Sequence, residues 1–75
     1  MEITTRDYLI TYGRTPRGRG SWAFDFYTSD RRLIGEHVWF AKNSVGSMSL
    51  TFTEAKKLAI EEGRRRGAAT INVLT

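Results

Sequence analysis

Residues 51–73, TFTEAKKLAIEEGRRRGAATINV, contain the clearest structural pattern in this 75-residue chain. Either Thr51 or Thr53 can cap a helix, and Thr51 with Glu54 three residues later matches a capping box. The residues that follow are mostly strong helix formers, and Gly67 is typical of the position where a helix ends. After it, Ile71 and Val73 alternate with polar residues, as in a strand. This stretch therefore predicts a helix followed by a closing strand.

The apolar face of the predicted helix is narrow. Ala55, Leu58 and Ala59 form it, and their small size predicts that the helix sits close to a sheet. Gly63 weakens the last turn by roughly 1 kcal/mol relative to alanine.

Residues 22–27, WAFDFY, predict a strand with three large rings on its core face: Trp22, Phe24 and Phe26. Tyr27 has the opposite parity. A turn at residues 29–32 precedes a third predicted strand, residues 33–42. One side of that strand carries Ile34, Val38 and Phe40, and the other carries Leu33, His37 and Trp39.

Two weaker patterns complete the predicted fold. Tyr8, Ile10 and Tyr12 alternate with their neighbours and predict a first strand that ends at Gly13. Residues 43–47 predict a loop, and residues 48–52 a short strand before the helix. The order is β-β-β-(β)-α-β in residues 1–75, a single small α+β domain of two layers. We expect a mostly antiparallel sheet of three to five strands with one helix packed across it.

Between the first two predicted strands lies GRTPRGRG, residues 13–20, which we call the arm. A simple hairpin needs two to five connecting residues, whereas the arm has about eight. Its arginines, Arg14, Arg17 and Arg19, are suited to gripping phosphates, each adding roughly one unit to the salt slope of binding. The alternative is a solubilising connector.

Positive charge is the main compositional signal. Twelve Lys and Arg against eight Asp and Glu give +4, and arginine is the residue preferred for planar recognition of phosphate or carboxylate. Besides the arm, arginines cluster at Arg31 and Arg32 and again in the run of residues 64–66, where Arg64 and Arg65 are the candidate contacts. We expect these to extend a phosphate-binding surface. The alternatives are solvated loops and, for the last cluster, a favourable interaction with the helix macrodipole.

The aromatic residues allow two interpretations. A stacking platform for single-stranded bases is one, and core packing is the expectation favoured for the rings of residues 22, 24 and 26. Tyr27 and Trp39 are then candidates for exposed rings. If Leu33, His37 and Trp39 leave the second sheet face apolar, that face is expected to be a partner or dimer surface.

The sequence gives little support for an enzymatic function. His37 is the only imidazole and cysteine is absent, so we predict no metal, no cofactor and no catalytic residues. A histidine-dependent nuclease is the remaining enzymatic alternative. The apolar runs are too short for a membrane span and the N-terminus lacks a signal-peptide layout, so we expect a cytoplasmic protein without membrane contact.

The fragments GSWAFDF (residues 20–26) and FTEAKKLA (residues 52–59), on a small sheet packed by one helix, resemble the arm-type DNA-binding domain of phage tyrosine-family integrases. That family has a Gly-x-Trp-aromatic strand and a Phe-Thr-x-x-Glu-Ala-like helix entry, and it lays its sheet in the major groove. The resemblance implies that Arg14, Arg17, Arg19 and Tyr27 face DNA. The long third strand and the closing strand depart from the family pattern.

The sequence therefore favours a small, basic, non-enzymatic protein that binds nucleic acid, DNA ahead of RNA, through the arm. The alternative is an interaction module of phage or bacterial type, an inhibitor or adaptor, that binds an acidic protein through the arm and an open sheet face. A homodimer is compatible with either.

Overall fold

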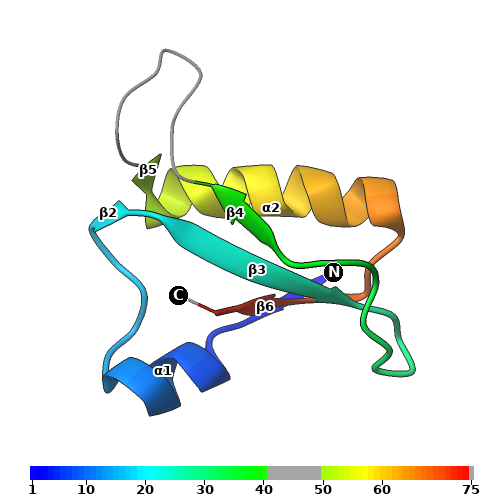
Figure 1. Cartoon of the computed structure of the whole chain (residues 1–75), viewed down its shortest axis with the longest axis horizontal. Coiled ribbons are helices and arrows are strands. Elements are labelled where there is room, and N and C mark those ends of the chain that lie inside the picture. Colours follow the sequence, from blue (N-terminus) through cyan, green and yellow to red (C-terminus); the bar gives the residue numbers. More distant parts are fainter. Residues whose placement is uncertain (41–49, 75) are drawn as a thin grey trace.

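Two helices and six strands make up the part of the chain that the computed structural model describes, residues 1–40 and 50–74 (Figure 1). In chain order they are β1 (Glu2–Thr4), α1 (Arg6–Tyr12), β2 (Arg19–Gly20), β3 (Trp22–Tyr27), β4 (Val38–Phe40), β5 (Leu50–Thr51), α2 (Phe52–Arg66) and β6 (Thr70–Val73). The predicted α+β class is confirmed, with one helix more than the sequence analysis expected.

The main sheet has the strand order β1-β6-β3-β4. The closing strand β6 therefore lies inside the sheet, parallel to β1 on one side and antiparallel to β3 on the other. β4 pairs antiparallel with β3, and β2 with β5 forms a separate two-stranded sheet. Figure 1 shows α2 along one side of the main sheet, with α1 on the other side near one end.

The core lies between the main sheet and α2. Its largest rings come from one face of β3, as the alternation predicted, and they are at most 3% exposed: Trp22, Phe24 and Phe26. Ile71 and Val73 of β6 are fully buried in the same layer and are register partners of Phe26 and Phe24. The indole nitrogen of Trp22 donates to the carbonyl of Leu50 at 3.0 Å, which satisfies the polar atom of this buried ring.

Small residues let α2 approach the sheet closely. Ala55, Ala59 and Gly63 recur at every fourth position, so they share one face of the helix, and all three are buried. A Cβ on Gly63 would lie 3.0 Å from Cδ1 of Ile71 and 2.8 Å from Sδ of Met1. The glycine that weakens the helix by its propensity therefore occupies a position with little room for a side chain.

Both predicted ends of α2 are confirmed. At the start, the backbone N–H of Glu54 donates to Oγ1 of Thr51 at 3.1 Å, and Oε1 of Glu54 accepts from the N–H of Thr51 at 2.9 Å. At the end, Gly67 adopts the left-handed conformation with φ 73°. These contacts use groups within a few positions of one another, which is why the sequence predicts them.

The capping box should make the stability of the fold depend on pH through Glu54. The hydrogen bonds from Thr51 hold the pKa of Glu54 below its ordinary value of 4.5, helped by the charges of Arg19 and Lys57. A carboxyl with a lowered folded pKa stabilises the fold above its unfolded pKa, and this contribution disappears as the pH falls from about 4.5 through the folded pKa. We expect Glu54→Gln, which keeps an accepting oxygen, to reduce the loss of stability on acidification. Urea midpoints measured between about pH 6 and 3 check this. An unchanged pH profile in the variant contradicts it.

The predicted first strand is wrong, because residues 6–12 form the helix α1. Positions 8 and 12 share a face in a strand and also in a helix, and the Tyr8 and Tyr12 rings lie 4.5 Å apart. Ile10 distinguishes the two structures: a strand would place it beside Tyr8, whereas it is 71% exposed and Tyr8 is 5% exposed. Gly13, with φ 70°, ends this helix and does not begin a hairpin.

Of the predicted third strand, residues 33–42, the structure describes residues 33–40. Among these, Val38–Phe40 pair with β3 and Leu33 forms an isolated bridge with Tyr27, while residues 41 and 42 lie outside the described residues. Gly35, with φ 64°, interrupts the extended backbone between them. The predicted loop at residues 43–47 lies outside the described residues, as do residues 48 and 49 of the predicted fourth strand; Leu50 and Thr51 form β5.

Candidate functional site

The sequence analysis expected the arm to join two strands of a hairpin. This is wrong, because residues 6–12 form the helix α1. The arm connects α1 to β2, and its last residues are held by the start of α2. Arg19 and Gly20 are register partners of Thr51 and Leu50, and the carbonyl of Gly18 accepts from the N–H of Phe52 at 3.2 Å. The arm therefore has an ordered end beside the first turn of α2.

The arm presents positive charge to solvent. Arg14 and Arg17 are exposed and, within the described residues, form no ion pair. Arg19 lies 3.9 Å from Glu54 with 61% of its side chain exposed, so this pair is weak and screened. Lys57, which lowers the pKa of Glu54, adds a cation at the same end of the molecule. Sequence analysis missed Lys57, because nothing in its spacing places it beside Arg19.

The other predicted phosphate-binding arginines lie at the far end. Glu54 is in the first turn of α2 and Arg64 and Arg65 in the last, about 15 Å apart at 1.5 Å per residue. Arg32 belongs to the turn after β3 and pairs with Asp30 at 3.2 Å, and Arg65 pairs with Glu62. The structure thus separates these arginines from the arm.

Arg66, the third residue of the helical arginine run, is structural. Its Nη1 donates to the carbonyls of Ile34 and Glu36, both at 3.0 Å, and its Nε lies 2.7 Å from Glu62. Its guanidinium lies 4.7 Å from the ring centre of Phe26. Arg66 therefore joins the end of α2 to the connection between β3 and β4.

The three predicted partner-surface residues are exposed. Leu33 and Trp39 are each 54% exposed, and the His37 and Trp39 rings meet edge to face at 6.3 Å. Apart from the buried Ala23, which is the register partner of Trp39, the rest of this sheet face is polar. The condition on which a partner surface was expected, an apolar second face, is therefore not met. The face presents Asp25 and Tyr27 from β3, Thr70 and Asn72 from β6, and Glu2 and Thr4 from β1.

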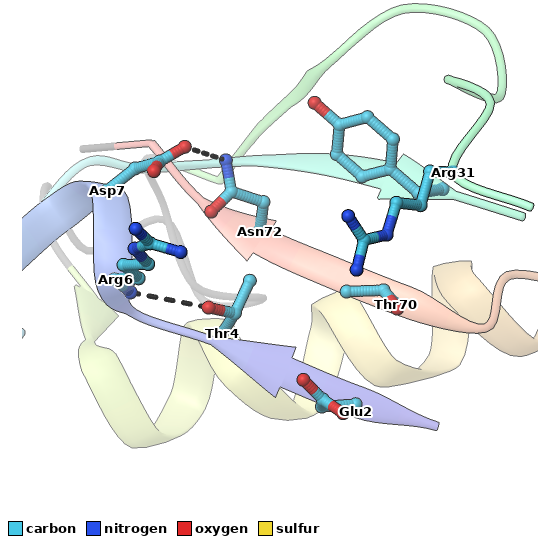
Figure 2. Close-up of a pocket in the computed structure, with 8 residues that line it drawn as sticks. Glu2, Thr4, Arg6, Asp7, Arg31, Thr70 and Asn72 are labelled. Atoms are coloured by element: carbon cyan, nitrogen blue, oxygen red, sulfur yellow. Dashed lines mark hydrogen bonds between the residues drawn. The ribbon is translucent and has the colours of Figure 1, made fainter. Parts of the chain in front are cut away.

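A partly open hollow of about 490 Å³ lies on this polar face (Figure 2). It is lined by Glu2, Thr4, Arg6, Asp7, Tyr27, Arg31, Thr70 and Asn72. Sequence analysis had named only Arg31 and Tyr27 among these as candidates. The others were missed because they come from α1, β1 and the interior strand β6, which only the sheet pairing brings together.

Asn72 forms the floor of the hollow. It is 5% exposed, and its Nδ2 donates to Oδ2 of Asp7 at 3.1 Å. Within the described residues its buried Oδ1 has no hydrogen-bond partner. Burial and then the carboxylates of Asp25 and Asp7 raise the pKa of Tyr27 above 10.0, which keeps its hydroxyl protonated at neutral pH.

Comparisons with protein-family models, with curated proteins and with solved structures find no match for this chain. Within residues 1–40 and 50–74, no helix is long and apolar enough to cross a membrane. The same residues contain no group of three or more His, Cys, Asp or Glu side chains that could hold a metal ion.

Proposed function

We propose that this protein binds nucleic acid, DNA ahead of RNA, through the phosphates, and that the arm is the main contact. The observation that carries the proposal is the pair of exposed arginines Arg14 and Arg17, which form no ion pair among the described residues, in the same short segment as Arg19. Arg19 and Lys57 both lie near Glu54, which pairs weakly with Arg19. The preference for DNA rests on the integrase resemblance.

The length of the arm suits a phosphate backbone. Residues 14 to 19 span at most about 17 Å when extended, and the phosphates of one strand follow at about 3.4 Å along the duplex axis. Arginines two or three residues apart can therefore each reach a different phosphate.

The polar sheet face is less suited to this contact. Glu2 and Asp25 point from this face, and Asp7 of α1 lies over it. Carboxylates repel phosphate, so the proposal places the nucleic acid along the arm and the start of α2.

The test is the salt dependence of binding. Three phosphate contacts give a slope near −2.7 on a log–log plot, so affinity should fall roughly 40-fold between about 50 and 200 mM salt. We expect the triple variant Arg14/Arg17/Arg19→Ala to lose nearly all of this slope. Fluorescence anisotropy with labelled single-stranded and duplex DNA and RNA measures it and identifies the preferred form.

The matched control is Arg32/Arg64/Arg65→Ala, which removes the same charge at the far end. Two of these arginines are already paired with carboxylates, so the slope should change by less than one unit. No binding by the parent protein at about 50 mM salt overturns the proposal, and so does an equal loss in both triple variants.

A second candidate function is a protein interaction, favoured by the exposed ring of Trp39 beside Leu33 and His37. It predicts a specific, acidic protein partner whose binding falls in Trp39→Ala at least as much as in the arginine variants of the arm. Phosphate binding through the arm predicts that Trp39→Ala binds DNA like the parent. The two functions are therefore separated by one variant.

A further inference from the structure

The hollow contains four charged groups that are not paired with one another. Arg6 and Arg31 contribute two positive charges, and Glu2 and Asp7 contribute two negative ones, so the lining is neutral in sum. None of the ion pairs among the described residues joins any two of them. Opposite charges that share a hollow without pairing are available to a ligand.

The positions of these groups explain why they stay apart. In Figure 2, Arg6 and Arg31 approach from opposite sides, with Asn72 between them and Thr70 beneath Arg31. Arg6 and Asp7 belong to α1, Glu2 to β1, and Arg31 to the turn after β3. The carboxylate of Asp7 is held by the amide of Asn72 at 3.1 Å.

Arg31 is held over the hollow by an uncommon backbone conformation. Its φ is 66°, the single non-glycine residue with positive φ in the described chain. Hydrogen bonds fix the turn: the N–H of Arg31 donates to the carbonyl of Thr28 at 3.0 Å, and that of Arg32 to Oγ1 of Thr28 at 3.0 Å. Glycine adopts this conformation without strain, whereas arginine does not. Strain of this kind gathers at functional sites.

The unpartnered Oδ1 of Asn72 is the second, independent sign of a ligand. A buried carbonyl oxygen without a donor is uncommon in folded proteins and requires an explanation. A ligand N–H group that enters beside Asp7 would supply the missing donor and also contact the carboxylate.

We propose that the hollow binds a small zwitterion, a molecule that carries one carboxylate or phosphate group and one ammonium group. The anionic group lies between Arg31 and Arg6, with the hydroxyl of Thr70 as a further donor. The ammonium group lies at Asp7 and donates to Oδ1 of Asn72. The volume of about 490 Å³ is within the range of small-molecule sites. This site is separate from the arm and does not depend on nucleic-acid binding.

The experiment is an NMR titration of ¹⁵N-labelled protein. The probes are β-alanine and O-phosphoethanolamine, which carry the carboxylate and the phosphate respectively on the same two-carbon amine. Propionate, inorganic phosphate and ethanolamine are the single-charge controls. The sequence has two asparagines and no glutamine, so the side-chain amide of Asn72 gives one of two such signals. We expect it to shift with at least one zwitterion at a Kd of about 1–10 mM, with each single-charge control at least about tenfold weaker.

Two variants complete the test. Arg31→Gly removes the guanidinium and suits the φ of 66°, so the turn should remain folded while affinity falls at least about tenfold. Arg32→Ala, one residue away and outside the lining, should bind like the parent. No shift of the Asn72 amide with either zwitterion up to about 20 mM overturns the proposal. So does binding of propionate or phosphate as tight as that of the matching zwitterion, or unchanged affinity in Arg31→Gly.

Discussion

Phe24→Ala should lower the free energy of unfolding by about 3–5 kcal/mol at 25 °C. Phe24 is fully buried at the middle of β3, where it is the register partner of Val73 and Val38, and its ring lies 5.9 Å from that of Phe40. Truncating a buried phenylalanine costs about 3–5 kcal/mol. A 75-residue domain has about 4–11 kcal/mol of total stability, so this one change removes a large part of it.

Circular dichroism with urea unfolding measures this effect. Phe24→Leu keeps most of the buried volume and should lose about 1–2 kcal/mol, which gives a readable transition if the alanine variant does not fold. Trp39→Ala is the control in the same sheet: its exposed ring should cost no more than about 0.5 kcal/mol. A Phe24→Ala variant that unfolds at the same urea concentration as Trp39→Ala contradicts this account of the core.

Arg66→Ala should be the most destabilising substitution in the arginine run. It removes two hydrogen bonds to the carbonyls of Ile34 and Glu36 and the contact with the ring of Phe26. Hydrogen bonds to charged groups contribute about 1.5–3 kcal/mol, and a cation over a ring about 0.5–1 kcal/mol. We expect a net loss of about 2–3 kcal/mol, because water replaces part of the lost contacts.

Arg64→Ala is the matched control, two residues earlier in the same helix turn. Arg64 is exposed and forms no ion pair among the described residues, so its loss should change stability by less than about 0.5 kcal/mol. Arg66→Lys keeps the charge but loses the planar fork, and its urea midpoint should fall between those of Arg66→Ala and the parent. Equal midpoints for Arg64→Ala and Arg66→Ala would show that the contacts of Arg66 do not stabilise the fold.

The candidate site was only partly predictable. The arm was found from its composition, because arginines and glycines in one short segment are visible in the letters alone. The element that precedes the arm was not predictable from the sequence, since the alternation of Tyr8, Ile10 and Tyr12 is typical of a strand. In the structure these residues form a helix, and Tyr8 is buried against Trp22. Arg66 differs from the other cations only through the residues that it contacts across the fold, and Lys57 lies at the same end as Arg19 only because the pairing of β2 with β5 brings Arg19 to Glu54.

By itself, the sequence determined the elements whose signals are local. Each end of the helix α2 is specified by local residues, Thr51 and Glu54 at the start and Gly67 at the end. The strands β3 and β6 follow from alternating side chains. Local hydrogen bonds and periodicity need no information from elsewhere in the chain.

Only the tertiary structure decided which distant residues meet. It placed β6 between β1 and β3, which brought Asn72 against Asp7 across 65 positions of sequence. It separated the exposed arginines of the arm from Arg66, which stabilises the fold, and from Arg31, which lines the hollow. These outcomes depend on strand pairing and on burial against the core, and both are set by contacts between segments that no local spacing specifies.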